Sequence, residues 1–317
     1  MIGHVELTVP GKAFFAGEYL AMTGGPALVA TVGPRFKMIA ERTSGLNQNP
    51  FHELSPAGKF WIENKNRLQN YNIEFIDPHQ GAGGWGGSTA EFALLSALDQ
   101  IVHYQESDQL LIDHRHLLME YQRLAWDGQS IYKPSGSDLV SQITGGLVYF
   151  DRNNGKLEKF NWPFEKLGFC FFQTGIKIKT HEHLQGLREL NTEPLHELMN
   201  QVISSLKSAN ETDFCSNINL YWKKLEELGL TAQSTQELLG QMKRDGVMAM
   251  KGCGALGADV ILIIYDKTKL NSQELSAIGQ EHGLNLKATD LDLARGISYQ
   301  FDEYDHQIGC SVTESRP

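Results

Sequence analysis

A glycine-rich segment that leads directly into a helical pattern is the first feature of this sequence that could do chemistry. From Gln80 it reads Gln-Gly-Ala-Gly-Gly-Trp-Gly-Gly-Ser-Thr-Ala-Glu-Phe. From Ser88 onward, apolar residues recur at helical spacing, at Phe92, Leu95, Leu98, Ile101 and Val102. Small residues let backbone N–H groups close around a phosphate, and the helix dipole favours negative charge at the same end. The segment from Gly81 to Ser88 therefore predicts an anion-binding loop.

Two common phosphate-binding patterns fit this loop poorly. Gly81, Gly83 and Gly86 match the dinucleotide pattern G-x-G-x-x-G. However, residues 77–80 separate the loop from the preceding strand, and no second strand with a terminal acid follows at the expected distance. A Walker-type P-loop is absent, because no Gly-Lys pair is followed by Ser or Thr.

Ser88 and Glu91 have the spacing of a capping box, in which each side chain satisfies a backbone N–H at the start of a helix. We therefore expect the helix to begin near Ser88, with Ser88 as its N-cap.

Two further glycine clusters flank this loop in the sequence. The first contains Pro10-Gly11-Lys12 and Gly17-Glu18-Tyr19, and the other runs from Gly252 to Asp259. Each cluster alone is typical of a structural turn. In this order and at these distances, however, the three clusters resemble the motifs of the GHMP kinase superfamily, which includes galactokinase and the homoserine, mevalonate and phosphomevalonate kinases. They are called the first, second (Gly81–Ala90) and third motifs below.

A fourth segment, Pro134-Ser135-Gly136-Ser137-Asp138 followed by Gly145-Gly146, resembles the part of mevalonate and phosphomevalonate kinases that carries the catalytic Asp. The resemblance implies that Asp138 accepts a proton from the hydroxyl or phosphate oxygen of the acceptor. It implies that Lys12 keeps Asp138 ionised and stabilises developing negative charge. The alternative for Asp138 is a helix cap after the Ser-Gly turn.

The resemblance also assigns residues to both substrates and to a metal. ATP would be bound by Gly83, Gly84, Gly86, Gly87, Ser88 and Thr89. The acceptor would be bound by Lys12, Glu18, Tyr19, Ser135, Gly136, Ser137, Thr180 and Gly254. Mg²⁺ would be held by Ser88 and by Asp127, which lies eleven residues before Asp138, where mevalonate kinases place a metal-binding carboxylate. The alternatives are a capping role for Ser88 and a solvated loop position for Asp127.

A segment with two lysines resembles a region near the acceptor site in this superfamily; it contains Thr174, Gly175, Lys177, Lys179 and Thr180. The lysines would meet an anionic substrate, and an edge strand with surface lysines is the alternative. His181 and His183 have no third metal ligand at a useful spacing, so we expect them to be surface residues.

Two motifs depart from the usual pattern. The second motif reads Gly84-Trp85-Gly86-Gly87-Ser88 where Gly-Leu-Gly-Ser-Ser is usual, so one hydroxyl is missing and a Trp is present. Leu256 and Ala258 interrupt the glycine run of the third motif. These changes leave open a non-catalytic relative that binds a nucleotide or metabolite.

The elements around these motifs predict an α+β protein. Short apolar runs broken by Gly and Pro in the first forty residues predict strands, as do Lys59–Glu63 and Tyr71–Ile76. The remaining expected elements are a helix at Leu117–Trp126, a strand at Phe169–Phe172, helical stretches at His181–Leu206 and Cys215–Leu228, and an apolar run at Val260–Tyr265. The resemblance implies a nucleotide-binding, ribosomal-protein-S5-domain-2-like domain over residues 1–165 and a ferredoxin-like GHMP domain over residues 166–317.

Composition narrows the function classes. The 317 residues carry a net charge of −10 without a run of like charges, which argues against a nucleic-acid partner. The four cysteines are far apart, as expected for reduced thiols rather than a zinc site or a disulfide scaffold. No signal peptide and no apolar stretch of membrane length is present, so we expect no membrane partner and a cytoplasmic location.

We therefore expect a phosphotransferase that uses ATP and Mg²⁺ to phosphorylate phosphomevalonate or mevalonate. Diphosphomevalonate decarboxylase, which shares the fold and also releases carbon dioxide, is a near alternative. Sugar or homoserine kinase activity stays open, and the sequence does not predict the oligomeric state.

Overall fold

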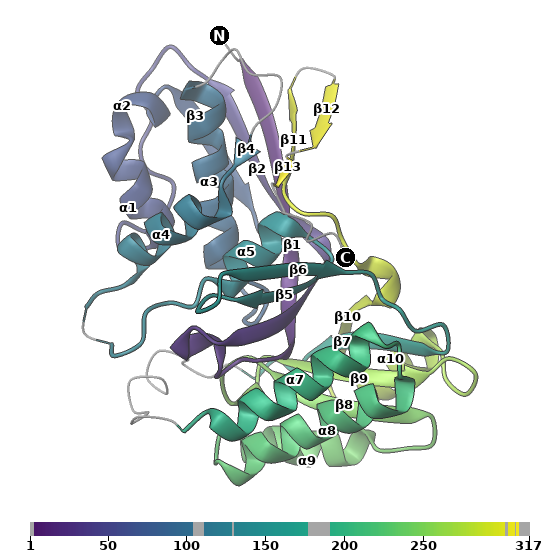
Figure 1. The fold of residues 1–317 in the computed structure, drawn as a ribbon. Helices are drawn as coiled ribbons and strands as arrows, with labels where there is room; N and C mark the ends of the chain where they lie inside the picture. The colour runs from purple at the N-terminus through teal and green to yellow at the C-terminus, as the bar shows by residue number, and fades with distance from the viewer. Residues whose placement is uncertain are drawn as a thin grey trace.

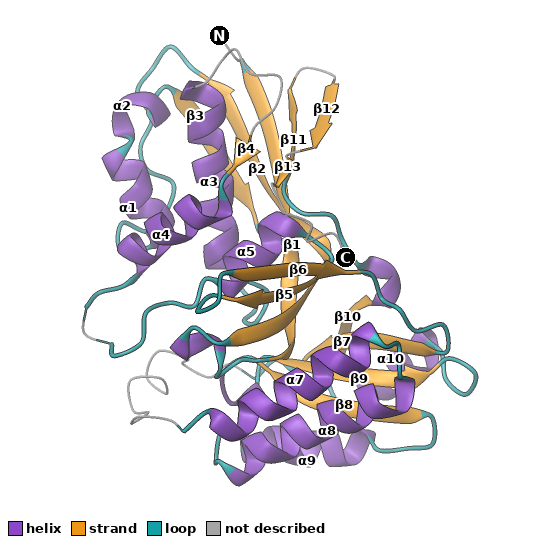
Figure 2. Cartoon of the chain, viewed as in Figure 1, coloured by secondary structure: helices purple, strands orange, loops and turns teal. Residues whose placement is uncertain are grey.

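The structure, a computed structural model, describes residues 3–103, 111–128, 130–176, 191–301, 304–307 and 309–310. Its elements form two main β-sheets with helices packed against them (Figures 1 and 2). Elements of the N-terminal half lie in the upper part of Figure 1, and most elements of the C-terminal half lie in the lower part. The expected α+β class is therefore confirmed.

The larger sheet is antiparallel and is built around two long strands. Its strands are β1 (His4–Ala16), β2 (Pro26–Arg42), β3 (Tyr71–Ile76), β5 (Leu147–Asp151), β6 (Lys156–Phe160), β11 (Ser298–Phe301) and β12 (Tyr304–Gln307). Their order is β12-β11-β1-β2-β5-β6, and β3 also pairs with β2. The apolar runs of the first forty residues lie in β1 and β2 alone, because the Pro10-Gly11 step is a register shift within the pairing and does not end the strand.

The helices of the N-terminal half are α1 (Pro56–Glu63), α2 (Lys65–Leu68), α3 (Gly87–His103), α4 (His114–Ala125) and α5 (Ser137–Thr144). Helices α3 and α5 both contact β1 and β2, so the ends of these two helices are set against the centre of the sheet. Short 3₁₀ turns lie at Ala21–Thr23, Ala255–Gly257 and Asp290–Asp292.

The strand expected at Lys59–Glu63 is wrong, because this segment belongs to helix α1. The Ser55 side chain caps the helix by accepting a hydrogen bond from the N–H of Gly58, and Pro56 occupies the first turn. The apolar run obscured this start signal. Phe60 packs edge-on against Phe92 of α3, with ring centroids 5.6 Å apart, so tertiary packing stabilises the helix.

The smaller sheet is also antiparallel and has the strand order β10-β7-β9-β8. Its strands are β7 (Leu167–Gln173), β8 (Val247–Cys253), β9 (Val260–Asp266) and β10 (Asn285–Thr289). The helices of this half are α7 (Glu193–Lys207), α8 (Glu211–Glu227), α9 (Gln233–Met242) and α10 (Ser272–Glu281). Numbered along the chain, the strands have the order 4-1-3-2, which is the ferredoxin-like arrangement that we expected.

The two halves share a core and a sheet. Phe15 of β1 packs edge-on against Phe169 and Phe171 of β7, at centroid distances of 5.0 and 5.7 Å. Strands β11 and β12 come from the C-terminal end yet continue the larger sheet beside β1. A short parallel pair joins β4 (Leu111–Ile112) to β13 (Gly309–Cys310). The expected division of domains at residue 165 stays a prediction.

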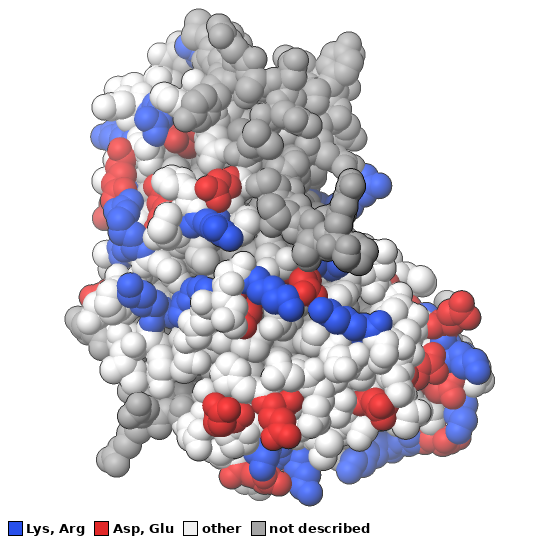
Figure 3. Space-filling view, in the orientation of Figure 1, with Lys and Arg blue, Asp and Glu red and all other residues white. Residues whose placement is uncertain are grey.

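Surface charge and the apolar character of the helices bear on whether the protein has nucleic-acid or membrane partners. Acidic and basic side chains are interspersed over the face shown in Figure 3. Among the described residues, no helix combines the length and apolar character needed to cross a membrane.

Candidate active site

Lys12 and Asp138 form an ion pair where the large sheet meets the helices. The Nζ atom of Lys12 lies 3.0 Å from Oδ2 of Asp138. Lys12 comes from the middle of β1, and its buried stem passes over Gly86, where a Cβ atom would lie 3.0 Å from Cγ of the lysine. Asp138 stands in the first turn of α5, at the positive end of the helix dipole. The structure thus brings the two expected catalytic residues together.

Asp138 has an exposed side and a buried side. The side chain is 29% exposed, while its Oδ1 atom is buried and has no hydrogen-bond partner among the described residues. Leaving a buried carboxylate oxygen without a partner is costly, so this atom points to a missing polar group such as a ligand, metal or water. A helix cap alone would not require such a group.

Gln142 holds the surroundings of this pair in place. It lies four residues after Asp138 on α5, and therefore on the same helix face. Its fully buried amide donates to the carbonyl of Pro10 at 2.9 Å and to the carbonyl of Gly86 at 3.2 Å, and it accepts from the Thr89 hydroxyl at 2.5 Å. Gln142 thus connects α5 to the first and second motifs. Our sequence reasoning missed it, although its helical spacing from Asp138 was a usable signal.

The second motif packs directly against the third. A Cβ atom on Gly83 would lie 2.5 Å from Oδ1 of Asp259, and one on Gly84 would lie 2.7 Å from Cγ2 of Val260. Side chains at these positions would push the two motifs apart. Gly254, in the third motif, also faces the Asp259 carboxylate, 3.3 Å from the position of its Cβ. Asp259 therefore joins the two glycine motifs, a role that we did not predict.

The capping role expected for Ser88 is wrong. Helix α3 begins at Gly87, so Ser88 lies inside the first turn, with an exposed side chain. The N–H of Ala90 and the hydroxyl of Thr89 both donate to the carbonyl of Gly86, which starts the helix one residue before the expected position. The Ser88 hydroxyl is consequently available for the metal or phosphate role, which stays a prediction.

Trp85, the unusual residue of the second motif, anchors the loop in the protein. It is fully buried, and its ring stacks on His79 with centroids 4.8 Å apart. Its indole N–H donates to the side chain of Gln173 on β7, and the Gln173 amide donates to the carbonyl of Asp259 at 2.9 Å. Burial lowers the pKa of His79, so the ring under Trp85 is neutral at neutral pH. The departure from the usual motif therefore creates a structural link to the second sheet.

A second ion pair joins the first motif to strand β8, which leads into the third motif. Lys251 of β8 is fully buried and pairs with Glu18, which is also buried. Burial alone would lower the pKa of Lys251, but Cys253 and Glu18 raise it above its ordinary value. Burial raises the pKa of the Cys253 thiol to about 11, so the thiol stays protonated. We did not predict Lys251, because a single lysine in an apolar strand carries no sequence signal for a partner more than two hundred residues away.

Tyr19 is also used inside the protein. Its hydroxyl donates to the carbonyl of Leu230 at 3.2 Å and accepts from the N–H of Leu256 at 3.0 Å. Burial raises the pKa of Tyr19 to about 12. Glu18 and Tyr19 were expected to bind the acceptor, and in this structure their polar groups contact Lys251 and the third motif.

The segment before Asp138 forms a tight turn. Gly136 has φ of 72° and packs against Leu118, so only glycine fits there. Ser137 is buried, and its N–H donates to the Ser135 hydroxyl at 3.3 Å. These residues position Asp138, and their contacts with an acceptor stay predictions.

The remaining expected residues lie apart from this cluster or outside the described residues. Asp127 lies on an exposed loop after α4 and accepts a hydrogen bond from the N–H of Ser130 at 3.4 Å. Thr174 donates to the carbonyl of Ala258, which places the 174–176 segment beside the third motif. The residues outside the described ranges are Lys177, Lys179, Thr180, His181 and His183.

A magnesium site does not need a dedicated cluster here. Within the described ranges, no group of three or more His, Cys, Asp or Glu side chains could hold a metal ion. Mg²⁺ in kinases takes most of its ligands from phosphates and water, with one or two protein oxygens. The exposed hydroxyl of Ser88 and the exposed carboxylate of Asp127 are the expected oxygens for such a partial site, whereas Oδ1 of Asp138 is buried.

Comparisons with known proteins identify the fold. No protein-family model and no curated protein matches the sequence. The phosphomevalonate kinase of Streptococcus pneumoniae matches with a TM-score of 0.71 at 17% identity, over 90% of this chain and 99% of that chain. The same enzyme has been solved in complex with phosphomevalonate and AMPPNP.

Two other kinases match over a similar extent. The mevalonate kinase of Methanococcus jannaschii has a TM-score of 0.68 at 14% identity, over 92% of this chain and 99% of that chain. The galactokinase of Lactococcus lactis, solved with galactose, has a TM-score of 0.69 at 11% identity, over 92% and 94%. The likeness spans nearly the whole length of each protein, and the expected resemblance is confirmed: this chain has the fold of the GHMP kinases.

Proposed function

We propose that this protein is an ATP-dependent small-molecule kinase whose catalytic residues are Asp138 and Lys12. The observation that supports this best is the ion pair between them, at the start of α5 and directly beside Gly86 of the second motif. A partly exposed carboxylate next to a buried ammonium and a glycine-rich loop is suited to phosphoryl transfer.

The proposed reaction follows from these positions. The acceptor oxygen loses its proton to Oδ2 of Asp138, the oxygen that Lys12 holds, because Oδ1 is buried. The oxygen forms a bond to the γ-phosphorus of ATP, the bond between that phosphorus and the β–γ bridging oxygen breaks, and ADP leaves. Lys12 stabilises the charge that develops near the acceptor, and the second motif with the start of α3 binds the nucleotide phosphates. Mg²⁺, held in part by Ser88 and Asp127, would neutralise the phosphate charge.

Phosphomevalonate or mevalonate is the acceptor that we propose. Gly17-Glu18-Tyr19 and the Pro134–Asp138 segment support it, and two of the matching structures are the corresponding kinases. The Streptococcus pneumoniae enzyme binds phosphomevalonate together with AMPPNP, an ATP analogue. Diphosphomevalonate decarboxylase is the alternative enzyme, and carbon dioxide release distinguishes it.

A non-catalytic nucleotide-binding protein is the second candidate. Two features favour this candidate. Gly87 stands where the family usually has a serine, and Leu256 has a left-handed backbone with φ of 53°. Both change the glycine-rich motifs that would surround the phosphates. The anchoring of Trp85 favours the enzyme, because it keeps the altered loop ordered against the second sheet.

The test is ADP release with MgATP and a panel of acceptors: mevalonate, phosphomevalonate, diphosphomevalonate, homoserine, galactose and glucose. ATP binding is measured alongside by calorimetry. Turnover with mevalonate or phosphomevalonate supports the proposal, and turnover only with another acceptor rejects the proposed substrate. Tight ATP binding without turnover on any acceptor rejects the enzyme in favour of the second candidate.

A further inference from the structure

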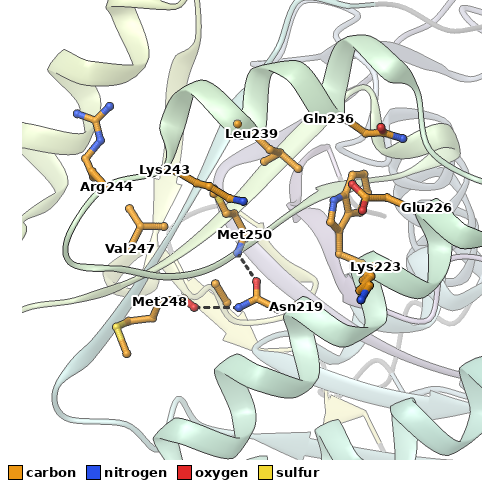
Figure 4. Close-up of a pocket in the computed structure, with 13 residues that line it drawn as sticks. Asn219, Lys223, Glu226, Gln236, Leu239, Lys243, Arg244, Val247, Met248 and Met250 are labelled. Atoms are coloured by element: carbon orange, nitrogen blue, oxygen red, sulfur yellow. Dashed lines mark hydrogen bonds between the residues drawn. The ribbon is translucent and has the colours of Figure 1, made fainter.

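A pocket lies between helices α8 and α9 and the outer edge of strand β8 (Figure 4). Its volume of about 600 Å³ lies within the range of small-molecule sites. Its apolar lining includes Trp222, Leu239 and Met250, which are all buried. The Asn219 amide donates to the carbonyl of Met248 at 3.0 Å and accepts from the N–H of Met250 at 3.2 Å. Asn219 thus satisfies the backbone of an edge strand that the pocket would otherwise expose.

The charges around this pocket are mainly positive and unpaired. Lys223, Lys243 and Arg244 line it, against the single carboxylate of Glu226. None of these three cations forms an ion pair with another described residue. By contrast, Lys224, next to Lys223, pairs with Glu227, and Asp245, next to Arg244, pairs with Lys269. In Figure 4, Lys243, the residue directly after α9, extends over Met250, and Lys223 and Arg244 lie at opposite ends of the pocket. In a chain of net charge −10, this excess of positive side chains around one pocket favours an anionic ligand.

Gly240 has no evident structural reason to be glycine. It lies inside α9, its φ is not left-handed, and a Cβ atom there would meet nothing within 4 Å. Glycine is the poorest helix former after proline, so an alanine would stabilise α9 without a clash. Gly240 lines the pocket, and its missing side chain leaves room there. Gly240 therefore keeps the pocket open and makes α9 less stable than an alanine at this position would.

Both walls of the pocket contact the third motif. The Trp222 ring lies against Gly257, 2.8 Å from the position that a Cβ atom would take. The N–H of Ala232, the N-cap of α9, donates to the carbonyl of Leu256 at 2.9 Å. Leu256 is held in a left-handed conformation, which is strained for a leucine. A ligand that moves Trp222 or α9 would therefore act directly on the third motif.

We propose that this pocket is a second ligand site, which binds a small organic anion and shifts the conformation of the third motif. The ligand carries a carboxylate, sulfonate or phosphate that meets Lys243, and an aromatic or aliphatic body that covers Trp222 and Met250. Two walls of the pocket touch residues 256 and 257. Binding of the ligand therefore shifts the conformation of the third motif, and the conformation of the third motif in turn changes the affinity for the ligand.

The site is tested with 8-anilinonaphthalene-1-sulfonate, an aromatic anion whose fluorescence rises in apolar surroundings. The full chain should bind it saturably at one site, and Lys243→Glu and Gly240→Leu should each weaken binding at least tenfold. Lys65→Glu, at an exposed lysine on α2, is the matched control and should bind like the native protein. Gly240→Ala should raise the melting temperature, which verifies that the glycine is not needed for folding.

Coupling is tested by hydrogen exchange at the amides of Leu256 and Gly257. Saturating probe should change their exchange rates at least threefold in the native protein and leave them unchanged in Gly240→Leu. The site is overturned if saturable binding is absent, or if Lys243→Glu and Gly240→Leu bind as tightly as the native protein. Unchanged exchange in the saturated native protein overturns the coupling. These measurements do not use turnover, so their outcome is independent of the proposed kinase activity.

Discussion

Two lysine–carboxylate pairs lie beside the glycine motifs, and they differ in exposure. Lys12 pairs with Asp138, whose side chain is 29% exposed, whereas Lys251 pairs with Glu18, at 0% and 5% exposure. The same residue types therefore serve two purposes. The first pair is accessible to a substrate next to the second motif, and the second pair is closed and connects the turn after β1 to β8. Burial, rather than residue type, separates the proposed catalytic pair from the structural one.

The largest effect is expected from Asp138→Asn in the accessible pair. Turnover should fall about 10²–10⁴-fold, because the amide cannot accept the proton of the acceptor. ATP affinity should change little, and the free energy of unfolding should fall less than on breaking the buried pair, because Asp138 is partly exposed and the amide oxygen still accepts from Lys12. ADP release, ATP calorimetry and urea unfolding measure these three quantities. Turnover close to that of the native protein would remove Asp138 from the proposed mechanism.

The closed pair should instead control stability. Lys251→Met leaves the Glu18 carboxylate buried without its partner, so the free energy of unfolding should fall by about 3–5 kcal/mol. The double variant Lys251→Met with Glu18→Leu should recover most of this loss, because no buried charge remains. Urea unfolding measures both variants. A loss of less than about 1 kcal/mol in the single variant would contradict a structural role for the Lys251–Glu18 pair, because leaving a buried charge unpaired should cost more than that.

Gln142 should have an intermediate effect, because it supports the accessible pair without belonging to it. Gln142→Leu removes hydrogen bonds to Pro10, Gly86 and Thr89, and should cost about 1–3 kcal/mol of stability. Turnover should fall as well, since the position of Lys12 depends on Gly86. Thr89→Val removes only the Thr89 hydroxyl contacts and should cost less in both measurements. Equal effects of the two variants would argue against Gln142 as the central connection.

Glu91 provides the smallest expected effect, as a carboxyl that has no ion-pair partner among the described residues. Burial, followed by the charge of Asp77, raises the pKa of Glu91 from 4.5 to about 6. The folded state therefore binds this proton more tightly than the unfolded chain does. The resulting stabilisation is fully present below about pH 4.5 and is lost as the pH rises through about 6. Unfolding free energies between pH 4 and 7 should show this slope in the native protein and a weaker slope in Glu91→Gln; identical slopes would exclude Glu91 as its source.

Local sequence patterns predicted the parts of the site whose signal is short-range. The loop before Phe92 and the strand of Val260–Tyr265 follow from glycine content and apolar periodicity, which act over a few residues. The meeting of Lys12 and Asp138 was predicted only through the resemblance of the motifs, and the structure places them 3.0 Å apart. The α+β class follows from the mixture of strand and helix patterns along the chain, whereas the ferredoxin-like half was expected only from the resemblance; the structure confirms both.

Tertiary structure decided the features that depend on partners far away in the sequence. Phe60 packs on Phe92 of α3 and stabilises helix α1 where a strand was expected, and Thr89 donates to the distant Gln142 of α5. The roles of Trp85 and Lys251 depend on Gln173 and Glu18, which no local pattern connects to them. Composition and periodicity specify which elements form. Which side chains are buried together, and hence which of two similar ion pairs stays open to a substrate, is determined only when the two sheets pack.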